Sequence, residues 1–212
     1  MSKLPDLAQP ADSSAPIAPI DPSVADLFLE RRTHNAFFDR PVDEATLRRL
    51  YDLTRWGPTA ANSQPLRVVF VQSAEAKERL RPTLAPGNVD KTMQAPVTAI
   101  LAWDTRFYDR MPELFPARPQ MRDTLAALPD ARREVMAAQS AHLQGGYFIL
   151  AARALGLDVG PMGGFDAAQV DAAFFPDGAW KSLLLVNLGY GDARGLFPRN
   201  PRLSFDDACR IA

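Results

Sequence analysis

Cysteine and histidine are scarce in this chain of 212 residues, which contains one cysteine and two histidines. Cys209 cannot form an internal disulfide, so the chain is not a disulfide-stabilised scaffold, and a reducing compartment is expected. His34 and His142 lie far apart in the sequence, and neither has a zinc-ligand spacing to Cys209. We therefore expect no metal site, and nothing in the pattern indicates a histidine-dependent hydrolase.

An excess of one charge and a long apolar run are also missing. Lys and Arg number 24 against 25 Asp and Glu, which leaves a formal net charge of -1. Nucleic-acid-binding proteins usually carry a clustered basic excess, so this class is not indicated. The chain contains no uninterrupted run of about 18 apolar residues, and its start lacks the apolar segment of a signal peptide. We expect a soluble, cytoplasmic protein without nucleic-acid or membrane partners.

The composition that remains is ordinary for a globular protein, with 47% hydrophobic and 23% charged residues. The length favours one domain over two. Prolines at positions 5, 10, 16, 19 and 22 predict a Pro-rich N-terminal tail over residues 1–22, because proline cannot sustain helix hydrogen bonding. A single domain is expected over residues 23–212.

Helical periodicity and capping residues predict one long helix over residues 131–155. They also predict four shorter helices, which start at Ser23, Asp43, Asp166 and Ser204. Runs rich in β-branched and apolar residues predict strands over 67–72, 97–103 and 182–188, and the charged stretch over 74–81 predicts a surface helix. Strands that alternate with helices favour an α/β or α+β domain.

Three segments depart from this regular pattern. Residues 104–130 contain prolines at 112, 116, 119 and 129 and are predicted to form an irregular loop of a length typical of lids. Gly145 and Gly146 interrupt the long helix, so a close neighbour is expected there. Residues 160–164 are predicted to form a glycine-rich turn.

The best-known nucleotide and nucleophile motifs are incomplete or missing. Gly189 and Gly191 follow a predicted strand as in a dinucleotide fingerprint, but Arg194 stands where the third glycine should be. The chain contains neither GxxxxGK[ST] nor GxSxG. A Rossmann site, a P-loop and a nucleophile elbow are therefore not indicated.

An arginine pair after the first predicted helix suits an anion. Arg31, Arg32 and Thr33 offer two guanidiniums and a hydroxyl that could grip a phosphate dianion, and Arg202 offers a further cation. The alternative is favourable placement of the pair against the negative end of the helix dipole.

A turn-rich run follows the second predicted helix. Pro58 and Thr59 precede Asn62 and Gln64, whose amides suit sugar hydroxyls and the donor–acceptor edge of a heterocycle. A loop stabilised by its own Asn side chain is the alternative.

Two later segments complete the pattern. Asn88 and Lys91 precede a buried strand, where an enclosed ammonium would stabilise negative charge on a reduced ring. Met162 precedes Gly163 and Gly164, which have no side chain, so the main chain there could approach a ring closely. An isolated surface lysine and a plain tight turn are the alternatives. Taken together, the four segments predict a site for flavin mononucleotide (FMN).

The same segments, in the same order, resemble the FMN-dependent nitroreductase superfamily from about residue 23 to the C-terminus. The resemblance implies an α+β sandwich whose central, mostly antiparallel sheet is flanked by helices. It also implies an intertwined homodimer with two FMN molecules at the subunit interface. The FMN contacts implied are Arg31, Arg32, Thr33, Asn35, Pro58, Thr59, Asn62, Gln64, Asn88, Lys91, Met162, Gly163, Gly164 and Arg202.

Within this superfamily the motifs at residues 56–62, 95–100, 153–162 and 201–205 are similar to the malonic semialdehyde reductases. That branch implies hydride transfer from NADPH or NADH through FMN to malonic semialdehyde, an aldehyde, which becomes 3-hydroxypropionate in pyrimidine degradation. The substrate carboxylate needs a cation. Candidates in the predicted loop are Arg106, Arg110, Arg118 and Arg122.

Three alternatives stay open. They are a broad nitro- or quinone reductase on the same scaffold, a flavin-consuming or deiodinating branch, and a non-catalytic flavin-binding dimer. No side chain is assigned as the proton donor to the substrate oxygen.

Overall fold

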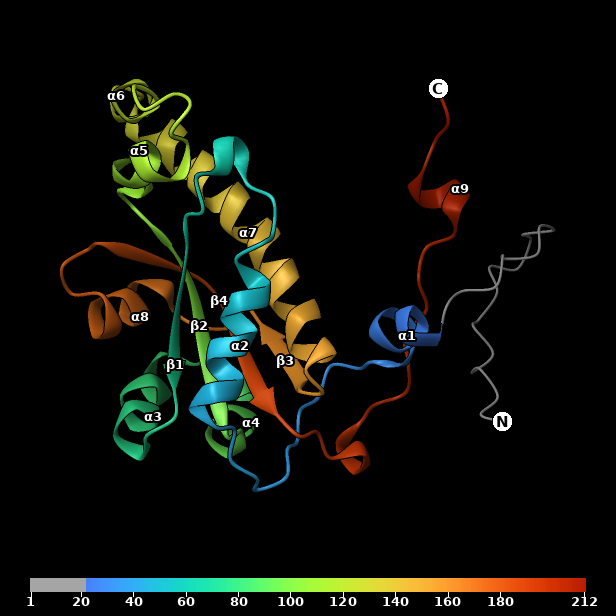
Figure 1. Ribbon diagram of the computed structural model, residues 1–212. Helices are drawn as coiled ribbons and strands as arrows, with labels where there is room; N and C mark the ends of the chain where they lie inside the picture. Colours follow the sequence, from blue (N-terminus) through green and yellow to red (C-terminus); the bar gives the residue numbers. More distant parts are fainter. Residues whose placement is uncertain (1–21) are drawn as a thin grey trace.

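The computed structural model describes residues 22–212, which form a four-stranded sheet with helices on both faces (Figure 1). The strands are β1 (Leu66–Val71), β2 (Val97–Asp104), β3 (Asp158–Met162) and β4 (Trp180–Gly189), in the order β1-β2-β4-β3. All neighbouring pairs are antiparallel. The predicted α+β class is confirmed. The predicted tail lies outside the described residues except for Pro22.

Helices fill the connections between the strands. The longer ones are α2 (Glu44–Thr54), α3 (Ala74–Leu80), α7 (Asp130–Ala154) and α8 (Ala167–Phe174). The shorter ones are α1 (Pro22–Ala25), α4 (Val89–Gln94), α5 (Met111–Leu114), α6 (Met121–Ala126) and α9 (Phe205–Ala208). Single helical turns occur at Asp26–Glu30, Ala60–Asn62, Arg81–Thr83, Pro86–Asn88, Phe107–Arg110 and Ala193–Gly195. No helix in the described part of the chain is long and apolar enough to cross a membrane.

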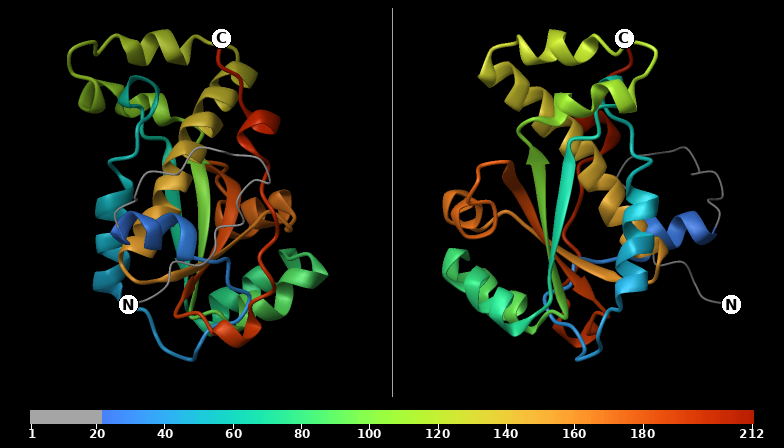
Figure 2. Two further views of the ribbon diagram at one scale, coloured as in Figure 1. Left: turned by 90° about the vertical axis from the view of Figure 1, so that its right-hand side faces the viewer. Right: turned by 60° about the vertical axis from the view of Figure 1, so that its left-hand side comes forward.

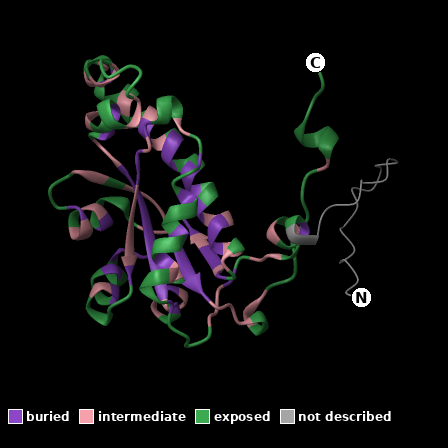
Figure 3. Cartoon of the chain, viewed as in Figure 1, coloured by how far each residue is buried: buried purple, intermediate pink, exposed green. Residues whose placement is uncertain are grey.

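The central strand β2 shows why helices cover both faces of the sheet. Val97, Ala99 and Leu101 pack into one apolar core together with residues of α2 and α7. Ile100 and Ala102 pack into a second core together with residues of α3 and α8. Successive side chains of a strand point to opposite faces, so one apolar strand supplies both cores. Figure 3 shows the buried sheet between exposed helix surfaces, and Figure 2 shows the same layers from two further sides.

Most of the predicted elements are confirmed, because local capping signals match the structure. The side chains of Asp43, Asp166 and Ser204 accept hydrogen bonds from backbone N–H groups at the starts of α2, α8 and α9. The predicted strands and the long helix are present with small shifts at their ends. The first predicted helix is shorter, since α1 passes into a π-helical turn that ends at Glu30.

The prediction that residues 104–130 form an irregular loop is wrong. The segment contains a helical turn and the helices α5 and α6. Pro112 falls in the first turn of α5, and Pro119 precedes α6. Proline is tolerated at these positions because the backbone N–H it lacks has no partner within the helix anyway.

The predicted turn at residues 160–164 is instead largely strand, because Gly160 to Met162 belong to β3. A Cβ atom on Gly160 would lie 2.5 Å from the carbonyl oxygen of His34, so glycine is needed for the chain to pass there. Pro161 is accepted because β3 is an edge strand, where a missing N–H breaks no ladder on the open side.

The two glycines of α7 differ in their surroundings. A Cβ on Gly145 would lie 3.5 Å from Leu101 Cδ1, whereas one on Gly146 would meet nothing within 4 Å. Among the described residues, the expected close neighbour is therefore present only for Gly145. Gly146 lies on an exposed face of the helix.

Candidate functional site

The segment after the first helices runs beside the edge strand β3. Thr33 forms a parallel bridge with Val159, and the backbone N–H of His34 donates to the Val159 carbonyl at 3.0 Å. The buried ring of His34 lies against Gly191, where a Cβ would come within 2.2 Å of it. This packing fixes the residues that follow His34 at one end of the sheet.

Several of the predicted FMN residues converge at this end. Asn88 Nδ2 donates to the Gly164 carbonyl at 2.7 Å, and a Cβ on Gly164 would collide with that amide. Met162 lies in β3 and its sulfur accepts from Thr92 of α4 at 3.5 Å. We call this group the β3 cluster, which comprises Thr33, Asn35, Asn88, Lys91, Met162, Gly163 and Gly164.

Lys91 is the cation of the β3 cluster. Lys91 is half-buried, and among the described residues its Nζ has one polar contact, to Asn35 Oδ1 at 3.5 Å, which is at the limit of a hydrogen bond. Its backbone carbonyl accepts from Asn187 Nδ2 of β4 at 3.2 Å. The main chain at Lys91 is therefore attached to β4, while the side-chain donors have capacity for a ligand.

The predicted amide loop has an unusual backbone. Ala61, Asn62 and Gln64 all have positive φ values, of 51°, 54° and 41°. Asn62 Nδ2 donates to the carbonyl of Leu114 in α5 at 2.8 Å, and Gln64 Nε2 donates to Asn62 Oδ1 at 3.0 Å. Each left-handed residue other than glycine costs energy, so these contacts hold the loop in one strained shape.

The amide loop and the β3 cluster lie at opposite ends of the sheet (Figure 1). The loop leads into Leu66, which pairs with Trp103 at one end of β2, whereas α4 leads into Val97 at the other. The eight residues of β2 span about 25 Å. One chain therefore does not bring the two predicted groups together.

The phosphate-binding candidates differ in how far their guanidiniums are already bonded. Arg31 pairs with Asp26 at 3.0 Å and with Asp158 at 3.6 Å. Arg32 Nη2 donates to the carbonyl of Phe197 at 2.7 Å. Arg202 is exposed and its guanidinium donates to carbonyls of its own segment. Arg31 is already matched by carboxylates, so Arg32 has more capacity for an anion.

The four arginines proposed for the substrate lie on the helical segment that replaces the expected loop. Arg106 pairs with Asp109 at 2.8 Å, Arg110 pairs with Glu113 at 3.0 Å, and Arg118 is exposed. Arg122 also pairs with Asp109, at 3.2 Å. Three of the four therefore already have carboxylate partners.

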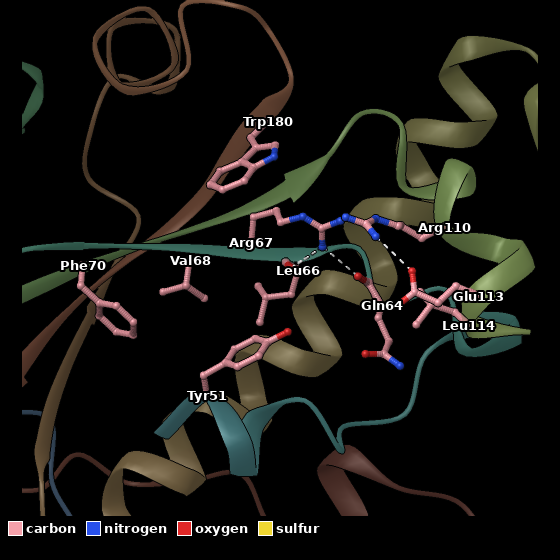
Figure 4. Close-up of a pocket in the computed structure, with 10 residues that line it drawn as sticks. All are labelled: Tyr51, Gln64, Leu66, Arg67, Val68, Phe70, Arg110, Glu113, Leu114 and Trp180. Atoms are coloured by element: carbon pink, nitrogen blue, oxygen red, sulfur yellow. Dashed lines mark hydrogen bonds and ion pairs between the residues drawn. The ribbon is translucent and has the colours of Figure 1, made fainter. Parts of the chain in front are cut away.

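A cleft of about 480 Å³ runs along the open edge of β1 (Figure 4). Arg67 from β1 donates to Asp104 Oδ2 at 2.6 Å, and its guanidinium lies next to that of Arg110. The lining residues are Tyr51, Gln64, Leu66, Arg67, Val68, Phe70, Arg110, Glu113, Leu114 and Trp180. Of the predicted FMN contacts the cleft includes Gln64 alone, so it is separate from the β3 cluster.

The prediction of a surface helix over residues 74–81 is wrong for one lysine, which is buried. Lys77 lies on the helix predicted as a surface helix, yet it is 5% exposed, and burial lowers its pKa to about 8. Lys77 lies three residues before the apolar Leu80, on the same face of α3, but this spacing does not show which groups would accept from a buried ammonium.

Comparison with known proteins agrees with the fold. Residues 29–190 match the Nitroreductase family. A protein of Rhodopseudomonas palustris (strain TIE-1), named provisionally as an NADH dehydrogenase/NAD(P)H nitroreductase, is 59% identical over 90% of this chain and 96% of its own. A similarly named protein of Ralstonia nicotianae is 55% identical over 91% and 98%.

Solved structures share the fold at low sequence identity. A provisionally named nitroreductase from Exiguobacterium sibiricum, in complex with FMN, has a TM-score of 0.80 and 18% identity over 88% of this chain and 96% of its own. Another, from Bacillus subtilis, has a TM-score of 0.80 and 20% identity over 89% and 98%. The fold defines a nitroreductase-type α+β protein. The chain belongs to the Nitroreductase family.

Proposed function

We propose that the protein is an FMN-dependent oxidoreductase that uses NADPH or NADH. The observation that carries this proposal is the β3 cluster. Within residues 22–212 the Lys91 ammonium has one polar contact, at 3.5 Å, and a Cβ on Gly163 would meet nothing within 4 Å. The relatives named for NAD(P)H nitroreductase activity and the FMN in the Exiguobacterium structure support it. The chemistry that bound FMN supplies is two-electron hydride transfer between a nicotinamide and an acceptor.

The residues of the chain have separate roles in this proposal. Lys91 supplies positive charge beside the ring, and Asn35 orients it. Gly163 and Gly164 let the main chain approach the ring, while Arg32 and Arg202 match the phosphate. Thr59, Asn62 and Gln64 supply amides and a hydroxyl from the strained loop.

A homodimer follows from the same proposal, because the two groups of predicted contacts lie at opposite ends of the sheet. A second copy would bring the amide loop of one chain to the β3 cluster of the other. The exposed face of α7 supports this, since Val135, Leu143 and Tyr147 are 54%, 55% and 44% exposed. Phe197 and Leu203 of the C-terminal segment are 72% and 76% exposed as well.

For the acceptor we propose malonic semialdehyde, reduced to 3-hydroxypropionate. The proposal rests on motif similarity and on the cations of the 104–130 segment, of which exposed Arg118 has the greatest freedom to bind a carboxylate. A broad nitro- or quinone reductase is the second candidate, and the names of the 59% and 55% identical relatives favour it.

The experiment has three stages. The absorbance spectrum of the purified protein should show bound flavin, and stopped-flow mixing with NADPH or NADH should bleach it. Steady-state kcat/KM should then be compared for malonic semialdehyde, propanal and a nitroaromatic compound. Malonic semialdehyde should exceed propanal, which lacks the carboxylate, and Arg118→Ala should narrow that gap. Equal kcat/KM for the two aldehydes with faster nitroaromatic turnover would favour the broad reductase. A bound flavin that neither NADPH nor NADH bleaches would refute the proposed oxidoreductase activity.

A further inference from the structure

Lys77 is a buried cation whose bonding capacity is fully used. Its Nζ donates to the carbonyls of Thr92 and Ala95 at 2.6 and 2.8 Å and to Thr98 Oγ1 at 3.0 Å. No carboxylate among the described residues lies within ion-pair distance of it. A buried charge without a counter-charge is costly unless every donor is satisfied, so the three acceptors explain how the ammonium is tolerated.

Two of these acceptors belong to the end of α4. Helix α4 has six residues, too few to be stable alone, and Ala95 is its C-cap. Carbonyls at a helix C-terminus lack partners within the helix and carry the negative end of its dipole. The Lys77 ammonium satisfies both needs and thereby attaches α4 to α3.

The contacts of Lys77 continue to the backbone of Lys91. Thr98 Oγ1, which accepts from Lys77, donates to Asn187 Oδ1 at 2.8 Å. Asn187 Nδ2 in turn donates to the Lys91 carbonyl at 3.2 Å. Thr98 and Asn187 are fully buried on the adjacent central strands β2 and β4. The relay therefore anchors the main chain that carries the cation of the β3 cluster to the rigid part of the sheet.

We propose that Lys77 is a positioning residue for the flavin site, whose buried ammonium fixes the end of α4 and sets the place of Lys91. The inference rests on the proposed function. Lys77 makes no contact with the β3 cluster through its own side chain and acts through α4 and the Thr98–Asn187 relay.

The test compares Lys77→Met with the wild type and with Lys181→Met, the same change at a lysine whose side chain is 46% exposed on the far end of β4. The FMN dissociation constant is measured by fluorescence titration of apoprotein, and the midpoint potential by dye equilibration. Lys77→Met removes three hydrogen bonds from a charged donor, so the end of α4 and the main chain at Lys91 lose their anchor. We expect FMN binding to weaken by about tenfold and the FMN midpoint potential to fall. Lys181→Met should do neither.

A double variant distinguishes an effect of Lys77 on the position of Lys91 from a general effect of Lys77 on the stability of the protein. If Lys77 acts through Lys91, the potential of Lys77→Met/Lys91→Met should equal that of Lys91→Met alone, because coupled residues are not additive. Additive shifts in potential, or a Lys77→Met protein with unchanged FMN affinity and potential, would overturn the proposal.

A milder variant covers the case in which Lys77→Met does not fold. Thr98→Val keeps the side-chain shape but breaks the relay, so it should shift FMN affinity and potential in the same direction by less. Wild-type behaviour of Thr98→Val would then overturn the inference. A wild-type protein that binds no FMN would instead refute the proposed function itself.

Discussion

Two single residues at the same end of the sheet, Lys77 and Lys91, differ in burial and in the number of acceptors that their ammonium groups contact. Lys77 is buried and donates to three acceptors, whereas Lys91 has one long contact among the residues that the structure describes, which leaves it spare donors there. A buried ammonium loses its hydration, so its charge costs stability, while a half-buried one remains available to a ligand. The first is suited to structure and the second to binding.

The stability of the protein should depend on the protonation of Lys77. Desolvation lowers its folded-state pKa from 10.5 to about 8, so between these values the unfolded state binds more protons. The contribution of this group to the free energy of unfolding is therefore fully present above pH 10.5 and is lost as the pH falls to about 8. Its full size is about 3 kcal/mol at most.

Urea unfolding at several pH values checks this expectation. From pH 8 to 10 the wild type should gain stability relative to Lys77→Met, which cannot titrate there. Lys181→Met should follow the wild type. A stability difference between wild type and Lys77→Met that does not change with pH would contradict the depressed pKa.

Removal of the Lys91 charge should change the flavin without unfolding the protein. The reduced ring carries more negative charge than the oxidised ring, so Lys91→Met should lower the FMN midpoint potential. For a two-electron couple about 30 mV corresponds to 1.4 kcal/mol, which dye equilibration resolves. Lys181→Met is the matched control, and retained FMN with an unshifted potential would remove Lys91 from the mechanism.

The amide loop is the element whose backbone departs furthest from ordinary geometry. Its bonds to Leu114 of α5 and to Ser140 of α7 link it to two helices. One side of α7 packs into the larger apolar core, and another side carries the exposed apolar residues Val135, Leu143 and Tyr147. The conformation of the loop is therefore set by helices that are distant in the sequence.

Replacement of two neighbouring alanines by glycine, one at a time, tests the backbone strain in this loop. Ala61 has φ 51° and ψ 31°, so Ala61→Gly removes a penalty of about 1–2 kcal/mol and should leave stability unchanged or slightly higher. Its neighbour Ala60 does not have a positive φ, so Ala60→Gly should destabilise by about 0.5–1 kcal/mol. Urea midpoints that fall equally for both variants would show that Ala61 is not strained.

The exposed apolar surface of the molecule bears on whether two copies of the chain associate. The exposed apolar residues of α7 and the separation of the two predicted halves of the flavin site both favour two copies. Figure 1 shows the C-terminal segment running away from the sheet. Its large apolar residues Phe197, Leu203 and Phe205 are 72%, 76% and 58% exposed. Such surfaces are rare on monomers, which fits an intertwined dimer.

Light scattering at micromolar concentration should report about twice the 23.3 kDa of one chain. Leu143→Lys places a charge on the exposed face of α7, so it should shift the equilibrium to monomer and release FMN together with it. Glu75→Lys on the outer face of α3 should do neither. A monomeric wild type that retains full flavin binding would contradict the two-chain site.

By itself the sequence determined the family and most of the local elements, but not the helices within residues 104–130 or the strand β3. Caps such as Asp43 and Asp166, the apolar period of the strands and the ordered motifs depend on neighbours within a few residues, so they can be read without coordinates. Only the tertiary structure decided which motifs meet. Lys77 was predicted to lie at the surface because its acceptors come from α4 and β2, up to 21 residues away, and helix periodicity reports no distant partner. The separation of the amide loop from the β3 cluster follows in the same way from the register of β1 and β2, since strand pairing depends on contacts between distant parts of the chain.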